Sequence, residues 1–130
     1  MPTEITVLAW SVGLVFVQIL LQSGLATLET GLAYNASARD DDQQPDGKYA
    51  GRAKRALANL LETYPVFVGL ALALTATGRA GGMGAQGALM WIVARAVYVP
   101  LYLAGVPYLR TIVFGVSIWG LLRMLEQLVG

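Results

Sequence analysis

Four long apolar stretches restrict this chain to one kind of fold. They cover about residues 5–28, 48–77, 87–105 and 111–129, and the first of them carries no charged side chain. A helix that crosses the hydrocarbon core of a bilayer needs about 20 mostly apolar residues, and inside lipid the backbone must satisfy its own hydrogen bonds. The chain is therefore expected to be an all-α membrane protein with four transmembrane helices in a single domain, residues 1–130.

The composition agrees with a membrane protein. Only 13% of the residues are charged and 56% are hydrophobic, whereas a soluble domain is about a quarter charged. A net charge of +1 gives no electrostatic basis for a nucleic-acid partner. The chain has no cysteine and no histidine, which excludes disulfides, a cysteine nucleophile, a Ser-His-Asp triad and metal sites built from thiolates or imidazoles. We expect no metal cofactor.

The lengths of the connections favour an up-down four-helix bundle. One long polar loop follows the first helix, and short connections near residues 78–84 and 106–110 join the others. Short connections place consecutive helices antiparallel to each other. The N-terminus lacks the basic segment and the cleavage site of a signal peptide, so the first stretch is expected to stay in the membrane. Its one polar face is expected to hydrogen-bond neighbouring helices and consists of Ser11, Gln18, Gln22 and Glu29.

Lysines and arginines near the helix ends predict the orientation in the membrane. Six of them lie on the side of the first and third loops, and only Arg79 and Arg123 lie on the other side. Basic residues gather on the cytoplasmic side of membrane proteins. We therefore expect a protein of the bacterial inner membrane, with the first and third loops in the cytoplasm and both termini in the periplasm.

A polar stripe runs into the second apolar stretch. In the segment RAKRALANLLETYP, the side chains of Arg52, Arg55, Asn59 and Glu62 are three or four residues apart, so they share one face of a helix. Charged groups in lipid are costly unless they pair or bind something, which marks this face as a candidate binding site. A juxtamembrane basic cluster would explain the arginines, but it does not explain Asn59 and Glu62 deeper on the same face.

A second polar stripe lies in the third apolar stretch. Arg95, Tyr98 and Tyr102 share one face by the same spacing, and Arg110 and Thr111 follow at the start of the fourth stretch. The two tyrosines would also fit an aromatic belt at the membrane surface. In an up-down bundle, however, both stripes and Arg110 meet at the cytoplasmic end, so we expect one site built from both.

These residue types suit a small zwitterion with several carboxylates. Guanidiniums bind carboxylates bidentately, a carboxylate or an amide binds an ammonium or amide group, and tyrosine hydroxyls donate or accept. Lipid-facing grooves beside the site would admit a hydrophobic second substrate. Glu62 and Arg95 are expected to form a buried ion pair, because a single buried charge would be too costly.

Two motifs in this sequence resemble those of a known family. The spacing of Arg52, Arg55, Asn59, Glu62 and Pro65 resembles the helix-2 motif of the MAPEG family, the membrane-associated proteins in eicosanoid and glutathione metabolism. The segment ARAVYVPLYLAGVPYLRT, residues 94–111, is similar to the family's helix-3 pattern of two tyrosines four apart followed by an arginine. The resemblance covers the whole chain in length and helix count. It points to the short bacterial branch, with a spacing similar to that of leukotriene C4 synthase and microsomal glutathione transferase.

The resemblance implies a homotrimer of four-helix subunits that binds glutathione between neighbouring subunits on the cytoplasmic side. Arg110 would be catalytic, because it would stabilise the glutathione thiolate, and Arg95 would pair with Glu62. Family members often carry an arginine at the end of the first helix, whereas here Arg39 is displaced into the loop. The residues that would bind glutathione are Arg52, Arg55, Asn59, Glu62, Tyr98, Tyr102 and Thr111.

Two classes of function stay open at this point. The first is a transferase or peroxidase that uses glutathione as co-substrate against a lipophilic electrophile or hydroperoxide. The second is a non-catalytic member of the same fold that binds membrane lipids or acts as a scaffold. Arg110 beside two tyrosines favours the enzyme. Conjugation, peroxide reduction and isomerisation are not distinguished by the sequence.

Overall fold

The computed structural model describes residues 1–31 and 47–130. This part of the chain forms four helices and no strand: α1 (Thr3–Thr30), α3 (Lys48–Ala76), α4 (Gly82–Ala104) and α5 (Pro107–Val129). Each helix is long and apolar enough to cross a membrane. The prediction of an all-α membrane fold with four spanning helices is confirmed. Arg39 lies outside the described residues.

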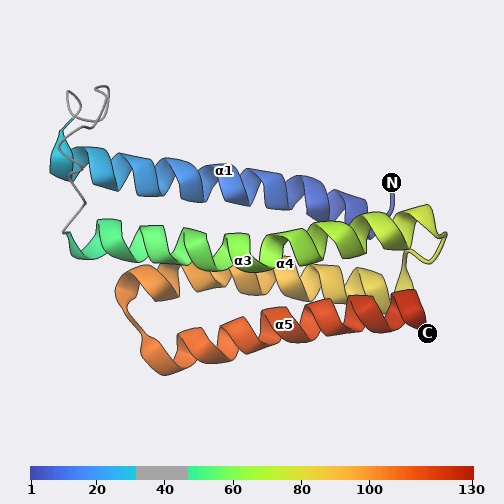
Figure 1. The fold of residues 1–130 in the computed structure, drawn as a ribbon. Coiled ribbons are helices and arrows are strands. Elements are labelled where there is room, and N and C mark those ends of the chain that lie inside the picture. The colour runs from blue at the N-terminus through green and yellow to red at the C-terminus, as the bar shows by residue number, and fades with distance from the viewer. Residues whose placement is uncertain (32–46) are drawn as a thin grey trace.

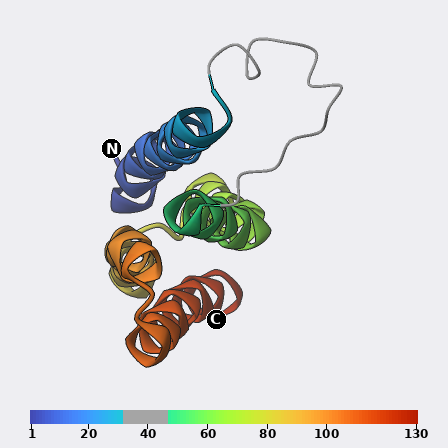
Figure 2. The same ribbon diagram turned by 90° about the vertical axis from the view of Figure 1, so that its left-hand side faces the viewer.

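The four helices lie side by side in alternating directions (Figures 1 and 2). The N-terminus, the α3–α4 turn and the C-terminus are at one end of the bundle, and the start of α3 and the α4–α5 turn are at the other (Figure 1). Helices α3 and α4 form the centre of the arrangement, because each of them packs against the three other helices. This topology brings the first turns of α3 close to the last turns of α4 and the first turns of α5.

Two helices begin earlier than the sequence predicted. Helix α4 starts at Gly82 rather than near residue 87, because Gly78 and Gly81 make the turn with φ of 72° and 104°. The buried carboxylate of Glu4 also accepts a hydrogen bond from the Gly81 N–H at 2.8 Å, and an anion at this position stabilises a helix N-terminus. Helix α5 starts at Pro107 rather than near residue 111. A proline is well suited to the first turn, where its missing N–H would have no partner in the helix.

Aromatic rings from α3 and α4 fill the centre of the bundle. Phe67 and Trp91 are completely buried, and their rings stack with centroids 4.0 Å apart. The Tyr64 ring lies 6.0 Å from Trp91, and its hydroxyl is 2.9 Å from that of Ser11 on α1. This hydrogen bond agrees with the predicted role of the polar face of α1, of which Gln18 is also buried.

Helices α4 and α5 pack backbone against backbone where two glycines face each other. A Cβ added to Gly120 would lie 2.6 Å from the carbonyl oxygen of Gly87, and one added to Gly87 would collide with the Gly120 carbonyl. Small residues at a crossing let two membrane helices pack backbone to backbone. This contact joins α4 and α5 towards the end of the bundle opposite Tyr102 and Arg110.

Candidate functional site

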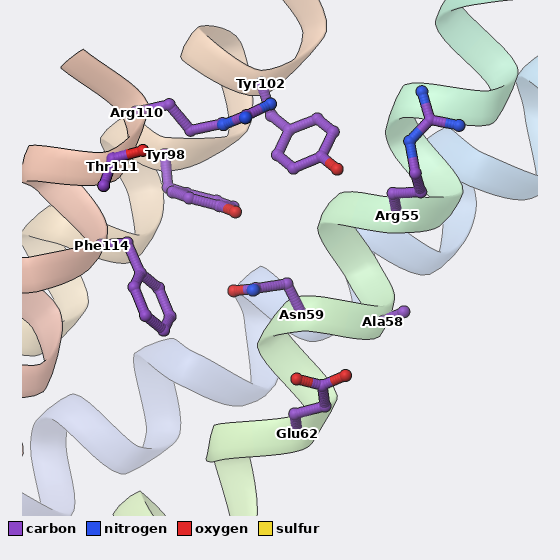
Figure 3. Close-up of a pocket in the computed structure, with 9 residues that line it drawn as sticks. All are labelled: Arg55, Ala58, Asn59, Glu62, Tyr98, Tyr102, Arg110, Thr111 and Phe114. Carbon is purple, nitrogen blue, oxygen red and sulfur yellow. The ribbon is translucent and has the colours of Figure 1, made fainter. Parts of the chain in front are cut away.

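A cavity of about 450 Å³ lies where α3, α4 and α5 converge, at the end of the bundle that holds the α4–α5 turn (Figure 3). Nine residues line it, and seven of them are site residues predicted from the sequence, five of which come from the two polar stripes. The structure therefore brings the two stripes together in one pocket. The lining residues are Arg55, Ala58, Asn59, Glu62, Tyr98, Tyr102, Arg110, Thr111 and Phe114.

Helix α3 supplies one wall of the pocket through its helical spacing. Arg55, Asn59 and Glu62 stand on successive turns of α3, and the Asn59 amide points towards Tyr98 and Phe114 (Figure 3). Arg55 and Glu62 are exposed in the single chain. Ala58 was missed by the sequence analysis. It lies three residues after Arg55 and four before Glu62, so the same periodicity would have placed it on this face, where its small side chain leaves space for a ligand.

Helices α4 and α5 supply the opposite wall, which is mostly aromatic. The rings of Tyr98 and Tyr102 lie 5.5 Å apart, and Tyr98 is 6.2 Å from Phe114. The Arg110 guanidinium carbon lies 4.6 Å from the centre of the Tyr102 ring, a distance that fits a cation–π contact. Phe114 was also missed by the sequence analysis, although it stands one helical turn after Arg110 on the same face of α5.

Arg110 and Thr111 belong to the first turns of α5, which starts at Pro107. The N-terminus of a helix carries a partial positive charge, so Arg110 and the helix end act with the same sign on a nearby anion. The Thr111 hydroxyl donates to the Pro107 carbonyl oxygen at 3.1 Å. The hydroxyl proton is thus engaged within α5 in this structure, and the hydroxyl oxygen remains able to accept a hydrogen bond from a ligand.

The predicted ion pair between Glu62 and Arg95 is not formed within the described part of the single chain. Arg95 is 1% exposed, and its Nη1 donates to Asn59 Oδ1 at 2.8 Å. No ion pair joins it to Glu62 among residues 1–31 and 47–130. The guanidinium lies over the Tyr98 ring, 4.4 Å from its centre, and this position directs it to Asn59, one turn before Glu62. Glu62 itself is exposed at the mouth of the pocket.

Arg52 is not among the residues that line the pocket. Its Nη1 donates to the carbonyl oxygen of Leu103 at 2.8 Å, and its guanidinium lies against Gly105, where α4 ends. The last carbonyls of a helix have no partner within the helix and attract cations. Arg52 therefore ties the second turn of α3 to the last turn of α4, beside the pocket.

The charges of the pocket suit a ligand that carries both signs. Arg55 and Arg110 are positive, Glu62 is negative, and Asn59 adds an amide. Arginines bind carboxylates, and a carboxylate binds an ammonium group. A single carboxylate with no thiolate or imidazole is a poor ligand set for a transition metal. The pocket therefore offers groups of both charge signs to a small zwitterionic ligand.

Comparison with known proteins agrees with this geometry. A model of the protein family described as "MAPEG family" matches residues 7–130, which covers all four helices except the first turn of α1, and every residue of the pocket. Searches of curated proteins and of solved structures gave no match.

Proposed function

The chain belongs to the MAPEG family, and we propose that it is a membrane-embedded, glutathione-dependent transferase or peroxidase. The observation that carries this proposal is the pocket in which Arg55, Glu62, Tyr102 and Arg110 meet from three helices. Family membership supports a membrane protein of glutathione or eicosanoid metabolism in general terms. The pocket supports glutathione as the co-substrate, because the tripeptide has two carboxylates, one ammonium group, two amides and a thiol.

The polar groups of the pocket match those of glutathione. Arg55 binds a carboxylate of the tripeptide, Glu62 binds its ammonium group, and Asn59 binds the peptide backbone. Tyr98 and Tyr102 form the wall against which the ligand lies. Once these groups of the tripeptide are assigned to α3, Arg110 at the N-terminus of α5 is the cation that faces the thiol.

Arg110 activates the thiol by stabilising its anion. A guanidinium close to a thiol favours the thiolate and lowers the thiol pKa, and the thiolate is the nucleophile. In conjugation, the sulfur forms a bond to an electrophilic carbon while the leaving group departs with its electron pair. In peroxide reduction, the sulfur attacks the terminal oxygen of the hydroperoxide, the O–O bond breaks, and the alkoxide leaves with the electron pair and takes up a proton from water. The resulting sulfenic acid reacts with a second glutathione to give glutathione disulfide and water. In both reactions the thiol proton is released to water.

The lipophilic substrate reaches this pocket from the bilayer. An apolar groove of about 470 Å³ lies between α4 and α5. It includes Val97 and Val113, which directly precede Tyr98 and Phe114 of the pocket in the sequence. Membrane lipids and a lipophilic electrophile share this apolar surface, while glutathione enters from water on the side that the basic residues assign to the cytoplasm.

We further propose that the active form is a homotrimer. Glu62 lies midway along α3 and is exposed in the single chain, and a carboxylate that faces lipid is costly. After Glu62, α3 exposes a stripe of residues that are spaced three or four positions apart and share one helix face. The stripe consists of Pro65, Gly69, Leu72 and Ala76. A second copy packed on this stripe would cover Glu62 and close the pocket.

The proposal is tested by glutathione binding and turnover of the purified protein in detergent. We expect the wild type to bind glutathione and to conjugate it to a generic aromatic halide, or to reduce a lipid hydroperoxide. Arg110→Ala should bind glutathione with little loss and should lose turnover. A wild type that binds glutathione without either reaction would support the non-catalytic alternative. A wild type that does not bind glutathione would refute the proposed function.

A further inference from the structure

Arg95 supports the pocket from behind. It is 1% exposed and does not line the cavity, but it contacts lining residues on all three helices. Its Nη1 donates to Asn59 on α3, and its guanidinium carbon lies 4.4 Å from the ring centre of Tyr98 on α4 and 5.9 Å from that of Phe114 on α5.

The hydrogen bond from Arg95 determines which end of the Asn59 amide is free. A carboxamide has an oxygen that accepts and an NH₂ group that donates. The oxygen is 2.8 Å from Arg95 Nη1, so the NH₂ group is left for the pocket. The opposite orientation would place this NH₂ group against a guanidinium, donor against donor, and the buried cation would lose an acceptor at high cost.

The oxygen of Asn59 is the one hydrogen-bond acceptor that Arg95 has within the described residues. Its Nε and Nη2 are buried and have no hydrogen-bond partner there. Loss of this hydrogen bond would leave the buried Arg95 guanidinium without an acceptor, so rotation of the Asn59 amide is unfavourable. The orientation of the amide is therefore set by the bundle before any ligand arrives.

We infer that Arg95 is a positioning residue that makes Asn59 a hydrogen-bond donor to the ligand. The ligand group beside Asn59 must then be an acceptor, either a carbonyl or a carboxylate oxygen, and an N–H group at that point is rejected. This inference rests on the proposed function, because it takes glutathione as the ligand and assigns an acceptor of the tripeptide to Asn59.

The first test replaces the free end of the amide and keeps its bond to Arg95. Asn59→Asp has the same shape and still accepts from Arg95, so thermal stability should be kept or increased. The atom that faces the pocket becomes an anionic acceptor, which cannot donate to the ligand. Glutathione affinity, measured by calorimetry, should fall at least about tenfold. Unchanged affinity in Asn59→Asp would overturn the inference.

The second test measures the coupling between Arg95 and Asn59. Asn59→Ala should weaken glutathione binding about tenfold in the wild-type background and less than about threefold in an Arg95→Met background, where the amide is no longer oriented. Arg55→Ala is the matched control, since Arg95 does not contact Arg55, and its loss should be equal in both backgrounds. Equal losses for Asn59→Ala would refute the positioning role.

The two proposals fail in different ways. A wild type without glutathione binding would refute the proposed function itself. A wild type that binds glutathione, with Asn59→Asp fully active in binding, would refute only the role of Arg95. If Arg95→Met does not fold, the Asn59→Asp comparison decides the question alone, because it leaves Arg95 in place.

Discussion

Arg52 donates a hydrogen bond from Nη1 to the carbonyl oxygen of Leu103 at 2.8 Å, and this bond connects the second turn of α3 to the last turn of α4. The two turns flank the pocket, which is lined by Arg55 on the first helix and Tyr102 on the second. An arginine that was predicted to bind the ligand is thus placed to hold the two walls of the pocket together. Two consequences can be measured.

Arg52→Met should lower the free energy of unfolding by about 1–3 kcal/mol, since a hydrogen bond with a charged partner and a favourable helix-end interaction are lost. Glutathione affinity should change little, because Arg52 does not line the cavity. Thermal unfolding in detergent and calorimetry measure the two quantities. A large loss of affinity with unchanged stability would restore Arg52 to the binding site.

Arg79 offers a matched control at the other end of the bundle. Its Nη1 also donates to a helix-terminal carbonyl, that of Leu128, at 3.1 Å, but the residue is exposed. Water competes for such a bond, so Arg79→Met should cost less than about 1 kcal/mol. Equal losses of unfolding free energy in Arg52→Met and Arg79→Met would show that Arg52 contributes no more to stability than an exposed arginine at a helix end.

Gly87→Ala should separate α4 from α5. The added methyl group would collide with the Gly120 carbonyl, so the helices must move apart. Overpacking of this kind costs about 1–3 kcal/mol, which exceeds the gain of about 0.5–1 kcal/mol from replacing glycine by alanine in a helix. Gly115→Ala is the control, because a Cβ there has open space around it and only the gain should remain. Thermal unfolding in detergent measures both changes, and equal stabilities of the two variants would contradict the close packing at Gly87.

The proposed trimer predicts that a bulky residue on one helix face blocks assembly. A Cβ at Gly69 on α3 or at Gly115 on α5 meets no other atom of the chain. Gly69→Phe should therefore fold and yield monomers in native mass spectrometry, whereas Gly115→Phe should stay trimeric like the wild type. Monomers alone for the wild type in mild detergent would rule out the trimer.

The absence of cysteine in the sequence makes the orientation in the membrane easy to test. Tyr108→Cys would place a single thiol at the α4–α5 turn, and Thr77→Cys would place one after α3, at the opposite end of the bundle. The six-to-two distribution of basic residues predicts that an impermeant reagent labels Thr77→Cys in intact cells and Tyr108→Cys only after lysis. The reverse pattern would invert the orientation.

The sequence predicted most of the site because helical periodicity alone decides which side chains share a face. The stripe of Arg55, Asn59 and Glu62 and the stripe of Tyr98 and Tyr102 needed only an up-down topology to meet, and the pocket contains both. This reasoning works best in a membrane protein, where nearly every polar residue inside an apolar stretch has a reason to be there.

The partners of individual side chains were harder to predict. Charge alone suggested that Arg95 pairs with Glu62, but the guanidinium bonds to the neutral Asn59 one turn earlier. Asn59 and Glu62 lie on the same face of α3, and a long side chain such as Arg95 could reach either of them. The choice depends on how the helices are rotated and on the rings that fill the space, here Tyr98 and Phe114. The early start of α5 at Pro107 is likewise a local effect of one residue.

The chemical role of Arg110 predicts a change in acidity rather than in binding. The glutathione thiol resembles free cysteine, whose pKa is about 8.5, so only a few per cent is thiolate at neutral pH. A guanidinium within about 4–6 Å can lower such a pKa by roughly 1–3 units. The N-terminus of α5, only three residues before Arg110, acts in the same direction. Bound glutathione should therefore be largely ionised at neutral pH in the wild type.

Arg110→Ala should shift the appearance of thiolate absorbance to higher pH and lower turnover, while glutathione affinity stays nearly intact because Arg55, Asn59 and Glu62 hold the rest of the tripeptide. The sign follows from the charge: without the cation the neutral thiol is favoured, so its pKa rises towards the free value. Arg55→Ala is the control and should weaken binding while leaving the thiolate titration of the bound form in place. If both the titration and turnover are unchanged in Arg110→Ala, Arg110 does not activate the thiol, and a protein that only binds lipid becomes the better description.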